Sequence, residues 1–138
     1  MLLFAVTVLI SCSKKNDPEA SSQEDDAEKH MTSSLSWKVQ TVTIDGVDNT
    51  SQYSGFTISF TSSSYTTTNG GVVWPASGSW SFNSTGTPPV TIIRNDGKVV
   101  QIAATESTVV MTLDWPTTTL GGKMESVKGK YVFTMVKK

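Results

Sequence analysis

Large apolar side chains alternate with small polar ones through most of this chain after residue 34. Phe56, Ile58 and Phe60 are separated by single Thr and Ser residues, and Trp80 and Phe82 repeat the pattern. Such alternation places successive side chains on opposite faces of a β-strand. Ser and Thr suit a strand face that meets water, and their hydroxyls compete with helical hydrogen bonding. The pattern predicts half-buried strands, and no segment shows the apolar stripe of a helix.

The alternating segments are short and are separated by turn residues such as Asp45-Gly46 and Asn69-Gly70-Gly71. We expect strands over residues 35–45, 54–61, 64–68, 77–83, 90–94, 98–104, 107–115 and 129–136. Short strands with hairpin-length connections are typical of an up-and-down barrel or a sandwich. We therefore predict that residues 34–138 form an all-β domain, a single antiparallel β-barrel of about eight strands, with a β-sandwich as the alternative.

Two local patterns fix details of this sheet. The inward parity of the first strand changes after Val39, so a bulge near Gln40 or Thr41 is needed to keep its apolar residues on one face. Around Asn95-Asp96-Gly97, a three-residue loop places Val90 opposite Ile102 and Ile92 opposite Val100. A two-residue turn would set Ile92 against Gln101 instead. The apolar pattern therefore favours the three-residue loop, with Gly97 in the left-handed region.

The N-terminal apolar run ends in Leu9-Ile10-Ser11-Cys12, which resembles the lipobox of a bacterial lipoprotein. The run is far shorter than the ~20 residues that cross a membrane as a helix, so we interpret residues 1–11 as a lipoprotein signal peptide. The resemblance implies acyl chains such as palmitate on Cys12 and anchorage in the membrane. An ordinary cleaved leader is the alternative. Ser13 is not the Asp that retains some lipoproteins at the inner membrane, which implies an outer-membrane location in the cell envelope.

The segment that follows is strongly polar. Residues 13–30 contain six acidic residues and three lysines, and their only apolar residues are Pro18, Ala20 and Ala27. Such a composition buries too little apolar area to offset the entropy of ordering. We therefore predict that residues 12–33 form a lipidated, disordered tether.

Four aromatic segments of the domain share their arrangement with a known family. They are Leu35-Ser36-Trp37, Phe56-Thr57-Ile58-Ser59-Phe60 followed by Tyr65, Gly78-Ser79-Trp80-Ser81-Phe82, and Gly129-Lys130-Tyr131-Val132-Phe133. Together they resemble the lipocalin-like (calycin-like) lipoproteins of Bacteroidetes, over nearly the whole domain. The resemblance implies an eight-stranded antiparallel barrel.

Aromatic side chains are the candidate ligand-binding residues. Trp37, Trp80, Phe82 and Tyr131 are expected inside the barrel, where they either fill a solid core or line a ligand cavity. Trp74-Pro75 and Trp115-Pro116 each place an indole before a residue that cannot extend a strand. These two indoles either form the rim of a mouth or fold over a barrel end as plugs.

Other functional classes find little support in the residues. The one histidine, His30, lies beside the predicted tether, and no cysteine remains for nucleophilic chemistry, so no enzyme is predicted. Asp45 to Thr50 lack the closing Glu of an EF-hand loop, and we predict no metal and no cofactor. The bases are scattered, which disfavours nucleic acid. The hypothesis is a non-catalytic binding module for a small apolar or glycan ligand, with an accessory subunit that contacts an envelope protein as the alternative.

Overall fold

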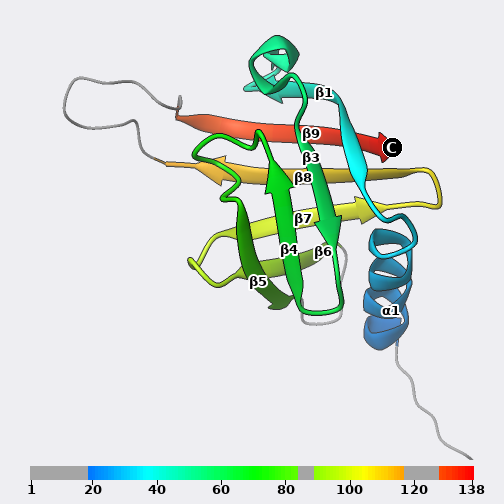
Figure 1. Cartoon of the computed structure of the whole chain (residues 1–138). Coiled ribbons are helices and arrows are strands. Elements are labelled where there is room, and N and C mark those ends of the chain that lie inside the picture. Colours follow the sequence, from blue (N-terminus) through cyan, green and yellow to red (C-terminus); the bar gives the residue numbers. More distant parts are fainter. Residues whose placement is uncertain (1–18, 84–88, 117–127) are drawn as a thin grey trace, which may run out of the picture.

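A computed structural model describes residues 19–83, 89–116 and 128–138 of the chain. One helix, α1 (Glu19–Met31), precedes the strands (Figure 1). The strands are β1 (Trp37–Ile44), β2 (Val47–Asp48), β3 (Thr57–Phe60), β4 (Ser64–Thr68), β5 (Ser77–Phe82), β6 (Val90–Arg94), β7 (Val99–Ala104), β8 (Thr108–Trp115) and β9 (Gly129–Lys137), with a 3-10 helix, η1 (Thr50–Tyr53), after β2.

The strands form one closed antiparallel barrel. From β3 to β9 each strand pairs with the next in sequence, and β1 pairs with both β3 and β9. This double pairing closes eight strands into a ring, to which β2 adds a short pairing at the far end of β1. The predicted all-β barrel is confirmed, and the sandwich alternative is wrong.

The register follows the apolar pattern. The pairing of β1 with β9 shifts between Val39 and Thr41, which confirms the predicted bulge. In the β6–β7 hairpin Val90 pairs with Ile102 and Ile92 pairs with Val100, as the three-residue loop requires. Gly97 has a φ of +86°, a left-handed conformation that a side chain would strain.

Aromatic rings fill the interior around Phe133. The centroid of its ring lies 5.1 Å from that of Tyr53, 5.4 Å from that of Phe56 and 6.0 Å from that of Tyr131. Trp74 joins this cluster, with its ring centroid 6.4 Å from that of Phe133. Edge-to-face and offset contacts at these separations are favourable beyond the area that they bury. The barrel core at this level is therefore made of packed side chains.

The helix α1 corrects the prediction of a wholly disordered tether. Ala27 and Met31 are 6% and 0% exposed and belong to the hydrophobic core, and α1 packs against β6 and β7. The indole nitrogen of Trp37 donates a hydrogen bond to the carbonyl of Met31 over 2.8 Å. Ala27 and Met31 are four residues apart and so lie on one face of the helix, which is enough to attach it to the barrel. The prediction of disorder used the average composition of the segment, to which two apolar residues contribute little. Residues 12–18 of the predicted tether lie outside the described residues.

Within the described ranges, no helix is long and apolar enough to cross a membrane. The predicted signal peptide and Cys12 lie in the part of the chain that the structure does not describe.

Candidate functional site

Trp74 and Trp115 lie at the same end of the barrel, where β4, β6 and β8 finish. The chain leaves β4 at Thr68 and enters β5 at Ser77, so Trp74 is in the connection between them. Trp115 is the last residue of β8. In Figure 1 this end carries the β6–β7 turn, and α1 lies at the opposite end. The prolines that follow both indoles predict a loop setting, and the structure places Trp74 in a loop and Trp115 at a strand end.

Trp74 is packed over the end of the barrel and is only 1% exposed. Its ring lies edge-on to Tyr65 at 5.3 Å, and the guanidinium carbon of Arg94 lies 4.7 Å from the ring centroid. The indole nitrogen is buried and has no hydrogen-bond partner among the described residues, so cation–π and ring contacts hold this side chain. This placement supports the interpretation of Trp74 as a plug.

Arg94 connects Trp74 and its loop to the β6–β7 hairpin. Its Nη1 donates to the carbonyl of Val73 over 2.8 Å, and its Nε and Nη2 donate to the two carboxylate oxygens of Asp96. Partial burial acts to raise the pKa of Asp96, but the hydrogen bonds from Arg94 and from the Lys98 amide, with the nearby positive charges, outweigh it and lower the pKa. The guanidinium of Arg94 is buried, and the bidentate pair with Asp96 supplies its counter-charge and two hydrogen-bond acceptors.

Trp115 has a different environment from Trp74. It is only partly buried at the edge of the core, and the Nζ atom of Lys98 lies 4.9 Å from its ring centroid. The β6–β7 hairpin thus presents one cation to each indole, Arg94 to Trp74 and Lys98 to Trp115. The first pair is sealed in the core, and the second lies where water reaches it.

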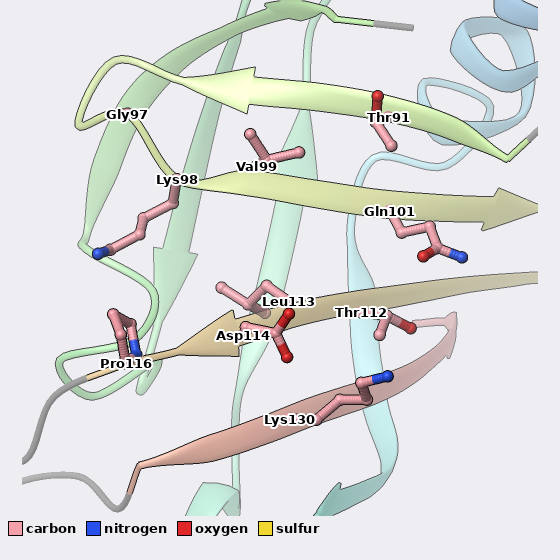
Figure 2. Close-up of a pocket in the computed structure, with 10 residues that line it drawn as sticks. All are labelled: Thr91, Gly97, Lys98, Val99, Gln101, Thr112, Leu113, Asp114, Pro116 and Lys130. Atoms are coloured by element: carbon pink, nitrogen blue, oxygen red, sulfur yellow. The ribbon is translucent and has the colours of Figure 1, made fainter.

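A hollow of about 330 Å³ runs from Lys98 and Pro116 along the outer surface of β6, β7, β8 and β9. We call it the outer groove. Figure 2 shows that its polar side chains come from neighbouring strands and line one surface; they are Thr91, Lys98, Gln101, Thr112, Asp114 and Lys130. A second hollow, which shares Asp114, Pro116 and Lys130, continues to Trp115, Lys128 and Asp45. Carboxylate and ammonium groups therefore line the same hollow as Trp115, and the hydroxyl and amide groups lie in the outer groove that adjoins it.

The lysines of the two hollows form no ion pair with a described residue, although the charge of Lys98 acts on the nearby Asp96. Among the described residues the one ion pair joins Arg94 to Asp96, so Lys98, Lys128 and Lys130 have no such partner there. Both oxygens of Asp96, the carboxylate nearest in sequence to Lys98, accept hydrogen bonds from Arg94. Asp45 accepts a hydrogen bond from the backbone amide of Lys130 over 2.9 Å.

The other predicted ligand residues lie in the barrel core. Trp37 and Tyr131 are fully buried, Trp80 is buried with its indole nitrogen donating to the carbonyls of Thr61 and Ser64, and Phe82 packs partly buried against the core. None of the four lines the outer groove.

Sequence reasoning missed the polar residues of the outer groove, because the period-two pattern assigns them simply to solvent. The register of β7 and β8 could have indicated one part of this site. A β7–β8 pairing that sets Gln101 opposite Thr112 brings Lys98 level with Trp115.

These observations define a class of protein by its fold: a closed eight-stranded antiparallel barrel with one additional strand and a plugged end. No family model, no curated protein and no solved structure matches this chain.

Proposed function

We propose that this chain is a non-catalytic lipoprotein of the outer membrane, anchored through Cys12, whose barrel binds a glycan in the cell envelope. It resembles the lipocalin-like lipoproteins of Bacteroidetes, but we place its binding site in the outer groove beside Trp115 and not inside the barrel. Of the two predicted ligand classes, we favour a glycan over a small apolar molecule.

One contrast carries the proposal: Trp74 is sealed in the core, and Trp115 borders a polar groove. Apolar ligands need a concave, mainly apolar cavity, whereas rings from Tyr53, Phe56, Phe133 and Trp74 pack together at this end of the barrel. A sugar presents many hydroxyl groups and an apolar ring face. The hydroxyl, amide and carboxylate groups of Thr112, Gln101 and Asp114 can form hydrogen bonds with the sugar hydroxyls. The indole of Trp115 can pack against the apolar face of the sugar ring.

The test is a glycan array probed with the full-length protein in detergent, as wild type and as Trp115→Ala. We expect wild type to bind a subset of glycans and Trp115→Ala to lose at least about tenfold in affinity, the equivalent of about 1.4 kcal/mol from one aromatic contact. Leu35→Ala is the matched control, since Leu35 is 95% exposed and lies outside the groove. It should leave binding unchanged.

Trp74→Ala separates the groove from the interior. Removing this buried ring should lower the free energy of unfolding by about 3–5 kcal/mol through the cavity that it leaves. The glycan affinity of the remaining folded protein should stay the same. Affinity that depends on Trp74 and not on Trp115 would move the site into the barrel, and a wild type that binds no glycan would refute the proposal.

Val99 favours a second candidate, an accessory subunit that contacts an envelope protein. This side chain is 45% exposed in the outer groove and pairs with Ile93 on the same outer surface. Exposed apolar side chains on a sheet face are typical of contacts with other chains when they form part of a larger patch. Photo-crosslinking from position 99 in intact cells should then give one recurrent protein adduct, whereas scattered adducts would count against this candidate.

A further inference from the structure

We infer that the outer groove selects an acidic saccharide, one that carries a carboxylate, and that Lys98 is the residue that recognises this charge. The inference rests on the proposed function, because it names the ligand class of the same site. It starts from the way in which the β6–β7 hairpin distributes its charges.

The hairpin contains two cations and one acid. Arg94 engages both carboxylate oxygens of Asp96, so this acid is committed to the plugged side of the hairpin. Lys98 donates only its backbone amide to Asp96, over 3.2 Å. The ammonium group of Lys98 is thus left without an ion pair in the described part of the chain, although a carboxylate lies two residues away.

The Lys98 side chain is also held in place. Its Nζ atom lies 4.9 Å from the centroid of Trp115, and the residue is partly buried against the barrel. A cation placed over an indole face loses less freedom on binding an anion than a lysine that extends into solvent. A carboxylate that pairs with Lys98 would bring the rest of its sugar ring close to Trp115.

The other charges agree with this assignment. Lys128 and Lys130 line the hollow that continues from Trp115, and neither has an ion pair with a described residue. Asp114 lies between Lys98 and Lys130 in Figure 2 and belongs to the same outer surface. We assign Asp114 to sugar hydroxyls, for which it is an acceptor, and Lys98 to the carboxylate.

The experiment is an array on which each acidic glycan stands beside its carboxyl-reduced, neutral counterpart, probed with full-length protein. Wild type should bind the acidic member of at least one pair at least tenfold more tightly. Lys98→Gln should abolish that preference and lower the affinity for the acidic member about tenfold, while Lys98→Arg retains it. Lys38→Gln is the matched control, since Lys38 is exposed on β1 outside the groove. Thermal unfolding should be the same for all three variants.

Two further readouts test the charge contact and its specificity. Inorganic phosphate at equal ionic strength should compete no better than chloride, and added salt should weaken the acidic ligand more than the neutral one. Equal binding of both members of each pair, or an unaffected Lys98→Gln variant, would overturn the inference while glycan binding through Trp115 still supports the proposed function. Absence of binding to any glycan would overturn both.

Discussion

At the scale of single residues, Arg94 decides how this end of the barrel is closed. Its side chain is fully buried, which is costly for a permanent charge unless the charge is paired and hydrogen-bonded. Asp96, the carbonyl of Val73 and the ring of Trp74 together satisfy it. The same residue therefore fixes the hairpin, the loop and the plug.

Asp96→Asn tests this arrangement. The change removes the negative partner of a buried cation. We therefore expect the free energy of unfolding at pH 7 to fall by about 2 kcal/mol relative to wild type, as for other hydrogen bonds to charged groups. The pKa of Asp96 is lowered in the folded protein, so the unfolded chain takes up the proton first as the pH falls below the ordinary pKa of an aspartate, 3.8. The contribution of Asp96 is present above that pH and is lost as the pH drops through its folded pKa.

Urea titrations at pH 7 and at pH values below 4 measure this effect. The difference in stability between wild type and Asp96→Asn should shrink as the solution is acidified. Glu106→Gln is the control, because Glu106 is exposed in the connection between β7 and β8. A difference that stays constant down to low pH would show that Asp96 is not charged against Arg94.

At the scale of secondary-structure elements, α1 contributes only Ala27 and Met31 to the hydrophobic core. Met31→Ala should lower the free energy of unfolding by about 2–4 kcal/mol, since Met31 is fully buried in the core that α1 shares with the barrel. Asp25→Ala, at an exposed position of the same helix, should change it by less than about 0.5 kcal/mol. Chemical denaturation followed by tryptophan fluorescence measures both. Equal effects of the two variants would mean that the segment is a free tether.

The contrast between α1 and the β6–β7 hairpin explains which elements the sequence could predict. In the hairpin, the positions of four apolar residues distinguish between two turn lengths. A shift of the strand register by one residue would move every side chain to the other face of the sheet. In α1, attachment depends on Ala27 and Met31 within a run of charged residues, and nothing local states that β6 and β7 offer a surface for them. Long-range packing, not local preference, places this helix.

The same distinction applies to the candidate site. The Trp-Pro pairs correctly indicated chain positions near strand ends, but they look alike in sequence and differ in the fold. Trp74 contacts the buried Arg94 and Trp115 contacts the partly buried Lys98, although Arg94 and Lys98 lie opposite each other on the same face of the hairpin. Only the closed register of β6 to β9 brings Lys98, Gln101, Asp114 and Lys130 into one groove.

At the scale of the whole molecule, the proposed anchor and the outer groove are separated by the barrel. Seven residues of chain from Cys12 to Glu19 span at most about 25 Å, so a lipid on Cys12 would hold the α1 end near the membrane. The β6–β7 turn and the end of β8 lie at the opposite end (Figure 1), and Trp115 is the last residue of β8. Under the proposed anchorage, the Trp115 end of the groove therefore faces away from the membrane, where envelope glycans have access to it.

Fluorophores at two exposed positions test this orientation on lipidated protein in vesicles that contain a nitroxide-labelled lipid. Glu106→Cys marks the turn between β7 and β8 at the α1 end, and Val47→Cys marks β2 at the opposite end, where Val47 is 65% exposed. The label at position 106 should be quenched more strongly than the label at position 47, because quenching by a lipid nitroxide falls steeply with distance. Replacing Cys12 by Ser should remove the quenching of both. Stronger quenching at position 47 would mean that the groove end faces the lipid, where a membrane component and not an envelope glycan would be the ligand within reach of Lys98.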